Sequence, residues 1–124
     1  MHRCIVLSPS VSFLLFSTYG YADGHANTEA AYKTSSIFDA TFKEHIRHGS
    51  PPSAICCDLN ADPQDIPALA EMLNAGKWVD IGARASTWGG IDNDTTCNAN
   101  NSTVSARRDY IFVTDTLLPI VASY

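Results

Sequence analysis

Hydrophobic positions after residue 28 repeat at the spacing of an amphipathic helix, with most charged residues lying off the apolar stripe. The stripe consists of Ala31, Phe38, Phe42 and Ile46. Asn27 or Thr28 stands where a helix cap belongs, and Gly49 followed by two prolines is a stop signal. The pattern therefore predicts a helix over about 28–48.

Four shorter apolar runs have the length and the β-branched and aromatic content of strands. They are SFLLFSTY (12–19), SAICC (53–57), KWVDI (77–81) and RDYIFVT (108–114). The run SAICC is apolar after its first residue, which is typical of a strand covered on both faces. The last run, LLPIVASY, has no terminating signal.

A second helix is expected between SAICC and KWVDI. Asp65 is placed to cap it, Pro67 is tolerated in its first turn, and Gly76 is placed to end it. Its apolar stripe consists of Ile66, Leu69, Ala70 and Leu73. The order strand–helix–strand–helix–strand–strand predicts an α/β fold with a mixed sheet and helices on one face. Between the last two predicted strands, residues 82–106 form a long polar segment of the kind that carries function.

The first 22 residues support two interpretations. A basic start, an apolar stretch and small residues before Asp23 resemble a secretory signal, and three Asn-x-Ser/Thr sequons would fit a secreted product. Ser8-Pro9-Ser10 interrupts that apolar region, however, and favours a buried strand over 12–19. Residues 1–11 stay unassigned, with a possible origin as a signal-like segment or a start-site artefact.

Charge and cysteine content restrict the binding partners and the cellular location that can be expected. The 124 residues suffice for one domain or part of one, the formal net charge is −5, and no basic stripe is present to neutralise phosphates. Any nucleic-acid role must therefore depend on a local site, with a metal ion offsetting the acidic charge. The apolar runs are too short to span a membrane. Adjacent Cys56 and Cys57 favour free thiols and an intracellular location, cytoplasmic or nuclear, with secretion as the alternative.

The first candidate site residues follow the end of the second predicted strand, SAICC. Asp58 and Asn60 would share a direction there because strand side chains repeat every second residue. A carboxylate beside an amide can accept a proton from water, hold a hard metal ion and contact a phosphate. The alternative is a turn rich in Asx residues. Asp109, at the entrance of the last strand, is a second candidate, unless it pairs with Arg107 or Arg108.

Five motifs occur in the order found in one known group of proteins. They are STYGYADG, CDLNADP, GKWVDI, a loop with STWGG and DTTC, and RRDYIFV. In this order, they resemble the C-terminal half of the endonuclease/exonuclease/phosphatase superfamily, which includes exonuclease III-like, apurinic and retroelement endonucleases and DNase I. The resemblance covers 12–124 and implies half of a four-layer α/β sandwich, a partial domain with the mixed sheet and its helices on one face.

The resemblance also implies site residues and a reaction. Asp58 corresponds to the water-activating and metal-holding carboxylate, and Asn60 to the amide that contacts the scissile phosphate. Tyr19 corresponds to a phosphate-binding tyrosine, and Asp109 to a carboxylate that orients a catalytic histidine. The implied activity is Mg²⁺-dependent hydrolysis of phosphodiesters by a nuclease of the DNA endonuclease type, with DNA as the partner and Mn²⁺ as the other candidate ion.

The sequence departs from that pattern in ways that set further expectations. The family's metal-holding Asn and Glu, and its C-terminal histidine, have no counterpart here. Cys57 replaces a glycine, and Arg108 replaces a buried aliphatic residue. We therefore expect a truncated and weak or inactive hydrolase with one sheet face uncovered. Two alternatives are a secreted, glycosylated binding module and a non-catalytic remnant that pairs with a chain supplying the missing half.

Overall fold

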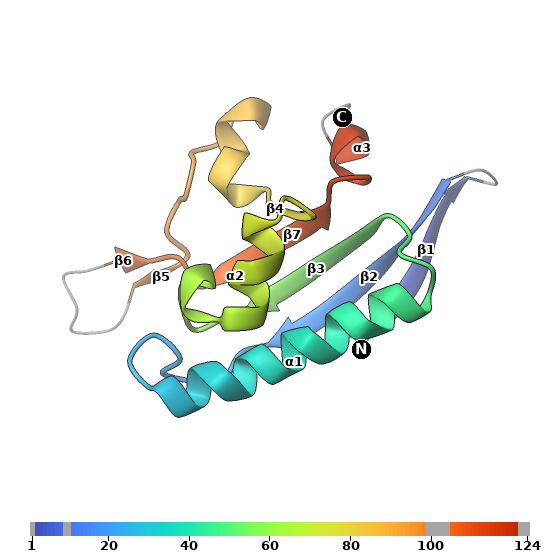
Figure 1. Cartoon of the computed structure of the whole chain (residues 1–124). Coiled ribbons are helices and arrows are strands. Elements are labelled where there is room, and N and C mark those ends of the chain that lie inside the picture. Colours follow the sequence, from blue (N-terminus) through green and yellow to red (C-terminus); the bar gives the residue numbers. More distant parts are fainter. Residues whose placement is uncertain (1, 9–10, 99–104, 122–124) are drawn as a thin grey trace.

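Five strands form one mixed sheet in the computed structural model, which describes residues 2–8, 11–98 and 105–121 (Figure 1). In spatial order they are β1 (His2–Ser8), β2 (Val11–Tyr19), β3 (Ser53–Asp58), β7 (Asp109–Thr114) and β4 (Trp78–Asp80). Only β2 and β3 are parallel. All four predicted strands are confirmed, and β1, which the sequence left unassigned, pairs with β2 as an edge strand.

The connection between β2 and β3 is the predicted helix, α1 (Thr28–Arg47). It begins at Asn27, whose side-chain Oδ1 accepts hydrogen bonds from the backbone N–H groups of Glu29 and Ala30, at 2.9 and 3.3 Å. The predicted stripe is buried at its first three positions, but Ile46 is 62% exposed. The period of 3.6 residues explains this error, because His45, seven residues after Phe38, completes the same face.

His45, which the predicted apolar stripe did not include, is a second correction. Its side chain is buried, and Nε2 donates to the backbone carbonyl of Pro51 at 2.9 Å. The ring also packs edge-on against Trp78, with 5.1 Å between ring centroids. His45 therefore belongs to the core, whereas His48 is exposed and contacts Glu44.

The second helix, α2 (Pro67–Asn74), begins differently from the prediction. Asp65 does not cap it, because residues Pro63–Asp65 form a separate 3₁₀ turn and Ile66 takes the cap position without a side-chain hydrogen bond. The Ser35 hydroxyl of α1 instead accepts the backbone N–H of Ala68 at 2.9 Å. A neighbouring helix thus provides the acceptor that Asp65 was expected to provide. Gly76, with φ +72°, follows the helix end as predicted.

The polar segment after β4 contains several short elements. A 3₁₀ helix, η2, spans Gly82–Trp88, and β5 (Cys97–Asn98) pairs with β6 (Ser105–Ala106) as a small hairpin. After β7 the chain forms a short helix, α3 (Leu118–Val121). No helix within the described ranges is long and apolar enough to cross a membrane.

Both long helices cover the same face of the sheet (Figure 1). Side chains of α1 and α2 pack there with alternate residues of the strands, including Phe16, Ile55 and Phe112. The intervening strand residues point to the other face, which we call the open face. Its central residues are Phe13, Leu15, Ala54, Val79, Ile111 and Val113. Short α3 contributes Leu118 and Val121 to the same apolar cluster.

Candidate active site

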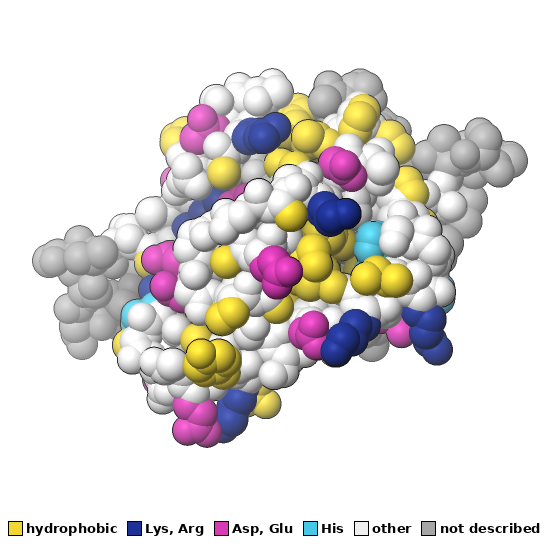
Figure 2. Space-filling view, viewed as in Figure 1, with side chains coloured by type: hydrophobic (Ala, Val, Ile, Leu, Met, Phe, Trp, Pro, Cys, Tyr) yellow, Lys and Arg dark blue, Asp and Glu magenta, His cyan; other side chains and the backbone are white. Residues whose placement is uncertain are grey.

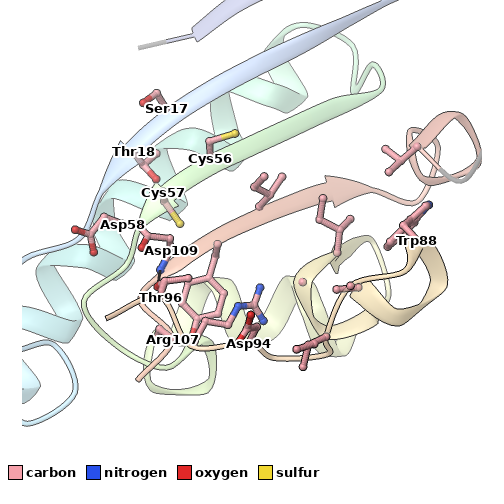
Figure 3. Close-up of a pocket in the computed structure, with 18 residues that line it drawn as sticks. Ser17, Thr18, Cys56, Cys57, Asp58, Trp88, Asp94, Thr96, Arg107 and Asp109 are labelled. Carbon is pink, nitrogen blue, oxygen red and sulfur yellow. Dashed lines mark hydrogen bonds between the residues drawn. The ribbon is translucent and has the colours of Figure 1, made fainter. Parts of the chain in front are cut away.

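Asp58 and Asp109 lie directly opposite each other, at the end of β3 and the start of β7 (Figure 3). The backbone N–H of Leu59 donates to the carbonyl of Arg108 at 2.7 Å. This bond makes Asp58 and Asp109 a non-hydrogen-bonded pair, the kind of opposed pair in which side chains approach most closely. The antiparallel pairing of β3 and β7 thus brings together two carboxylates that are fifty-one residues apart in the sequence.

The Asp58 carboxylate is not fully satisfied by the protein. Its Oδ1 atom is buried and has no hydrogen-bond partner among the described residues. Like charges opposite each other in a sheet are unfavourable, and so is a buried carboxylate oxygen without a donor. A cation or a hydrogen-bond donor placed between Asp58 and Asp109 would relieve both conditions.

Tyr19 extends this row of residues to a third strand. It is paired with Asp58 in the parallel register of β2 and β3, so Tyr19, Asp58 and Asp109 follow one another across three neighbouring strands. The tyrosine side chain is 66% exposed. Three of the four predicted site residues therefore share one edge of the sheet.

Asn60 occupies a different kind of position from the one its spacing suggested. Strand β3 ends at Asp58, so strand alternation does not extend to Asn60. Its backbone is left-handed, with φ +53°, and its side-chain Nδ2 donates to the backbone carbonyl of Gly20 at 3.1 Å. Gly20 is itself in tight contact, because a Cβ there would lie 2.1 Å from the carbonyl oxygen of Leu59. Asn60 therefore joins the chain segments that follow β2 and β3.

The two arginines before Asp109 have partners other than that aspartate. Arg107 forms a bidentate pair with Asp80, in which the Nη1–Oδ2 distance is 2.8 Å, and its guanidinium lies 4.3 Å from the ring centroid of Tyr110. Arg108 reaches Asp62 at 3.8 Å. The alternative in which an arginine neutralises Asp109 is therefore not what the structure contains. The sequence carried no local signal for the Arg107–Asp80 pair, because its members are 27 residues apart.

A cavity of about 860 Å³ runs along the open face from the carboxylate pair. Figure 3 shows Asp58 and Asp109 at one end of it and Trp88 at the other. Cys56 and Cys57 also line it, and both are free thiols, as expected. Burial raises the pKa of the Cys57 thiol to about 12, so this cysteine is a neutral group in the site.

The oxygen atoms of this row fit a hard divalent cation in part. Mg²⁺ is commonly held by one or two carboxylates together with waters and substrate phosphates, and Asp58 and Asp109 provide two carboxylates. Among the described residues, no group of three or more His, Cys, Asp and Glu side chains is arranged to hold a metal. The pair can therefore serve as one side of a metal site that also needs ligands from elsewhere.

Two solved structures have a fold similar to that of this chain. An endonuclease/exonuclease/phosphatase family protein from Bacteroides thetaiotaomicron matches 88% of this chain with a TM-score of 0.55 and 17% identity. The mannosyl-6-phosphatase Bt3783 from the same organism matches 87% with a TM-score of 0.55 and 20% identity. No family model matches the sequence, and no curated protein does.

These similarities define the class of fold. The chain has the fold of part of an endonuclease/exonuclease/phosphatase domain, as the motif resemblance implied, and the predicted α/β class is confirmed. The match covers 38% and 39% of those two chains, so this chain corresponds to well under half of their length. At 17% and 20% identity the comparison identifies the fold, and a fold alone does not determine activity or substrate.

Proposed function

We propose that Asp58 and Asp109 belong to the active site of a metal-dependent phosphodiester hydrolase that acts on DNA, and that this chain by itself turns over slowly or not at all. The observation that carries the proposal is the pair of opposed carboxylates with an unpartnered, buried Asp58 Oδ1. Its setting, the edge of a phosphoesterase-type sheet, supports the same reaction class.

Each of the four predicted site residues has a role in the proposed reaction. Asp58, with Asp109 beside it, would hold Mg²⁺ or Mn²⁺, and that ion would offset negative charge on the phosphate oxygens. Asp58 would also accept the proton of the attacking water. The exposed Tyr19 hydroxyl and the second amide hydrogen of Asn60 would donate to phosphate oxygens. Asp109 would orient a histidine that comes from outside the described residues.

Low activity follows from what surrounds the pair. Within the described ranges, no third metal-binding side chain joins Asp58 and Asp109. In Figure 2 acidic and basic side chains are interspersed over the face that carries α1 and α2, and the net charge of the chain is −5. With more negative than positive charge overall, the chain offers a DNA substrate little electrostatic attraction. The remaining ligands and the histidine are expected from a further polypeptide segment.

The test combines metal binding with DNA cleavage. Mn²⁺ binding to the purified chain is measured by electron paramagnetic resonance, and nicking of supercoiled plasmid is followed with Mg²⁺, with Mn²⁺ and with EDTA. We expect one Mn²⁺ site that Asp58→Asn removes, and slow nicking that both EDTA and Asp58→Asn abolish. Absence of Mn²⁺ binding, or nicking that Asp58→Asn leaves unchanged, would overturn the proposal.

Phosphomonoesters are the competing substrates, because one structural neighbour is a mannosyl-6-phosphatase. Parallel assays with p-nitrophenyl phosphate and bis(p-nitrophenyl) phosphate separate the two classes. Preference for the diester supports the nuclease proposal. Preference for the monoester, sensitive to Asp58→Asn, would keep the site and replace the substrate.

A second candidate function, association with another chain, is favoured by the open face. Ile111 in β7 is 42% exposed there, and Ile91, which lines the same cavity, is 69% exposed. Contiguous exposed apolar side chains are typical of interaction surfaces. A sedimentation coefficient that increases with protein concentration would support this candidate, provided that Ile111→Asp abolishes the increase. A chain that stays monomeric at every concentration would oppose self-association on this face.

A further inference from the structure

The backbone N–H of Asp109 does not bond to any strand that the structure describes. In the non-hydrogen-bonded pair with Asp58, the N–H of Asp109 points away from β3. On that other side β4 pairs with β7 from Phe112 to Thr114, and the bond from the Ile81 N–H to the carbonyl of Ile111 extends the pairing by one residue toward the start of β7. The start of β7, which carries the second carboxylate, therefore lies beyond the end of the β4 ladder.

Thr96 takes the place of that missing strand. Its hydroxyl oxygen accepts the backbone N–H of Arg108 at 2.9 Å and the backbone N–H of Asp109 at 3.0 Å. Its own backbone N–H donates to the carbonyl of Ala106 at 3.1 Å, in line with the β5–β6 hairpin. One side chain thus satisfies two consecutive amides, and it lies against Asp109 in Figure 3.

From this geometry we propose that Thr96 is a positioning residue for the carboxylate pair. It anchors the polar segment 82–106 to the first residue of β7, and so it holds Asp109 at the register that places it opposite Asp58. The inference rests on the proposed function only for its consequence, a weaker metal site when the anchor is lost. The anchor consists of the two hydrogen bonds from the backbone N–H groups of Arg108 and Asp109 to the Thr96 hydroxyl, and these can be measured without any metal.

The experiment compares Thr96→Val, which keeps the shape and removes the acceptor, with Thr96→Ser, which keeps the acceptor. Thr95→Val is the matched control, because the hydrogen bond at Thr95 is made by its backbone N–H to the Asp94 side chain. Amide hydrogen exchange and ¹H–¹⁵N chemical shifts of Arg108 and Asp109 report the anchor. Mn²⁺ affinity reports its consequence, and urea denaturation reports the fold.

In Thr96→Val we expect the Arg108 and Asp109 amides to exchange about tenfold faster and Mn²⁺ to bind about tenfold more weakly. The denaturation midpoint is expected to stay within about a tenth of the wild-type value, because the bonds are exposed. Thr96→Ser and Thr95→Val are expected to behave as wild type in all three measurements. Unchanged exchange at both amides in Thr96→Val would overturn the inference. If the wild type binds no Mn²⁺, the proposed function fails, and the amide exchange still decides the role of Thr96.

Discussion

The side-chain amide of Asn60 donates a hydrogen bond to the backbone carbonyl of Gly20, 3.1 Å away and forty residues earlier in the sequence. The N–H of Gly20 in turn donates to the carbonyl of Asp58 at 2.7 Å. These bonds join β2 and β3 at the edge where Tyr19 and Asp58 lie. Asn60 therefore supports the candidate site structurally, whatever it contributes to phosphate binding.

Replacement of Asn60 by alanine is expected to lower the free energy of unfolding by about 2 kcal/mol. About half of this is the lost hydrogen bond, and the rest is the strain of alanine at φ +53°. Asn60→Gly loses the bond without the strain and should be the less destabilised variant. Urea denaturation measures both. Equal stability of the two variants would show that the left-handed backbone is not the source of strain.

The Arg107–Asp80 pair should stabilise the segment that leads into β7. Its two side chains are only 10% and 15% exposed, so removal of one partner leaves a charge that is largely buried. We expect Arg107→Leu to lower the free energy of unfolding by about 3 kcal/mol. The exposed Arg47–Glu44 pair is the control, and Arg47→Leu is expected to cause no measurable loss. Similar losses in both variants would contradict the prediction.

Truncation of adjacent residues of β7 should lower the stability by very different amounts, because the two side chains face different sides of the sheet. Phe112 is fully buried under the helices, and Phe112→Ala is expected to cost about 4 kcal/mol. Ile111 is 42% exposed on the open face, so Ile111→Ala should cost less than about 1 kcal/mol. Thermal or urea denaturation of the two variants decides this. A larger loss at Ile111 would mean that the open face is covered in solution.

The buried Cys57 thiol predicts a loss of stability at alkaline pH. Burial raises the pKa of Cys57 from 9.0 to about 12, so the folded state favours the neutral thiol. Its contribution is complete below about pH 9 and declines as the pH rises toward about 12, with a slope of about 1.4 kcal/mol per pH unit. Cys57→Ala should flatten the stability curve above pH 9, whereas Cys97→Ala, at an exposed position, should not. Identical curves would contradict the raised pKa.

The sequence predicted elements best where one local pattern governed them. Asn27 and the period of apolar residues predicted α1 to within one residue, and short apolar runs predicted β2, β3 and β7. Predictions failed where a distant residue provided what a local one was expected to provide. His45 is buried by Trp78 and Pro51, and Ser35 of another helix accepts the N–H that Asp65 was expected to accept at the start of α2.

The candidate site divides in the same way. By itself, the sequence determined which carboxylates stand at strand ends, because hydrophobic periodicity and turn residues are local properties. Only the tertiary structure decided that Asp58 and Asp109 form a close, non-hydrogen-bonded pair, that Asn60 bonds to Gly20, and that Thr96 holds the start of β7. Strand register and the partners of individual amides depend on how distant segments pair. That pairing is settled by packing of the whole sheet, and no local pattern records it.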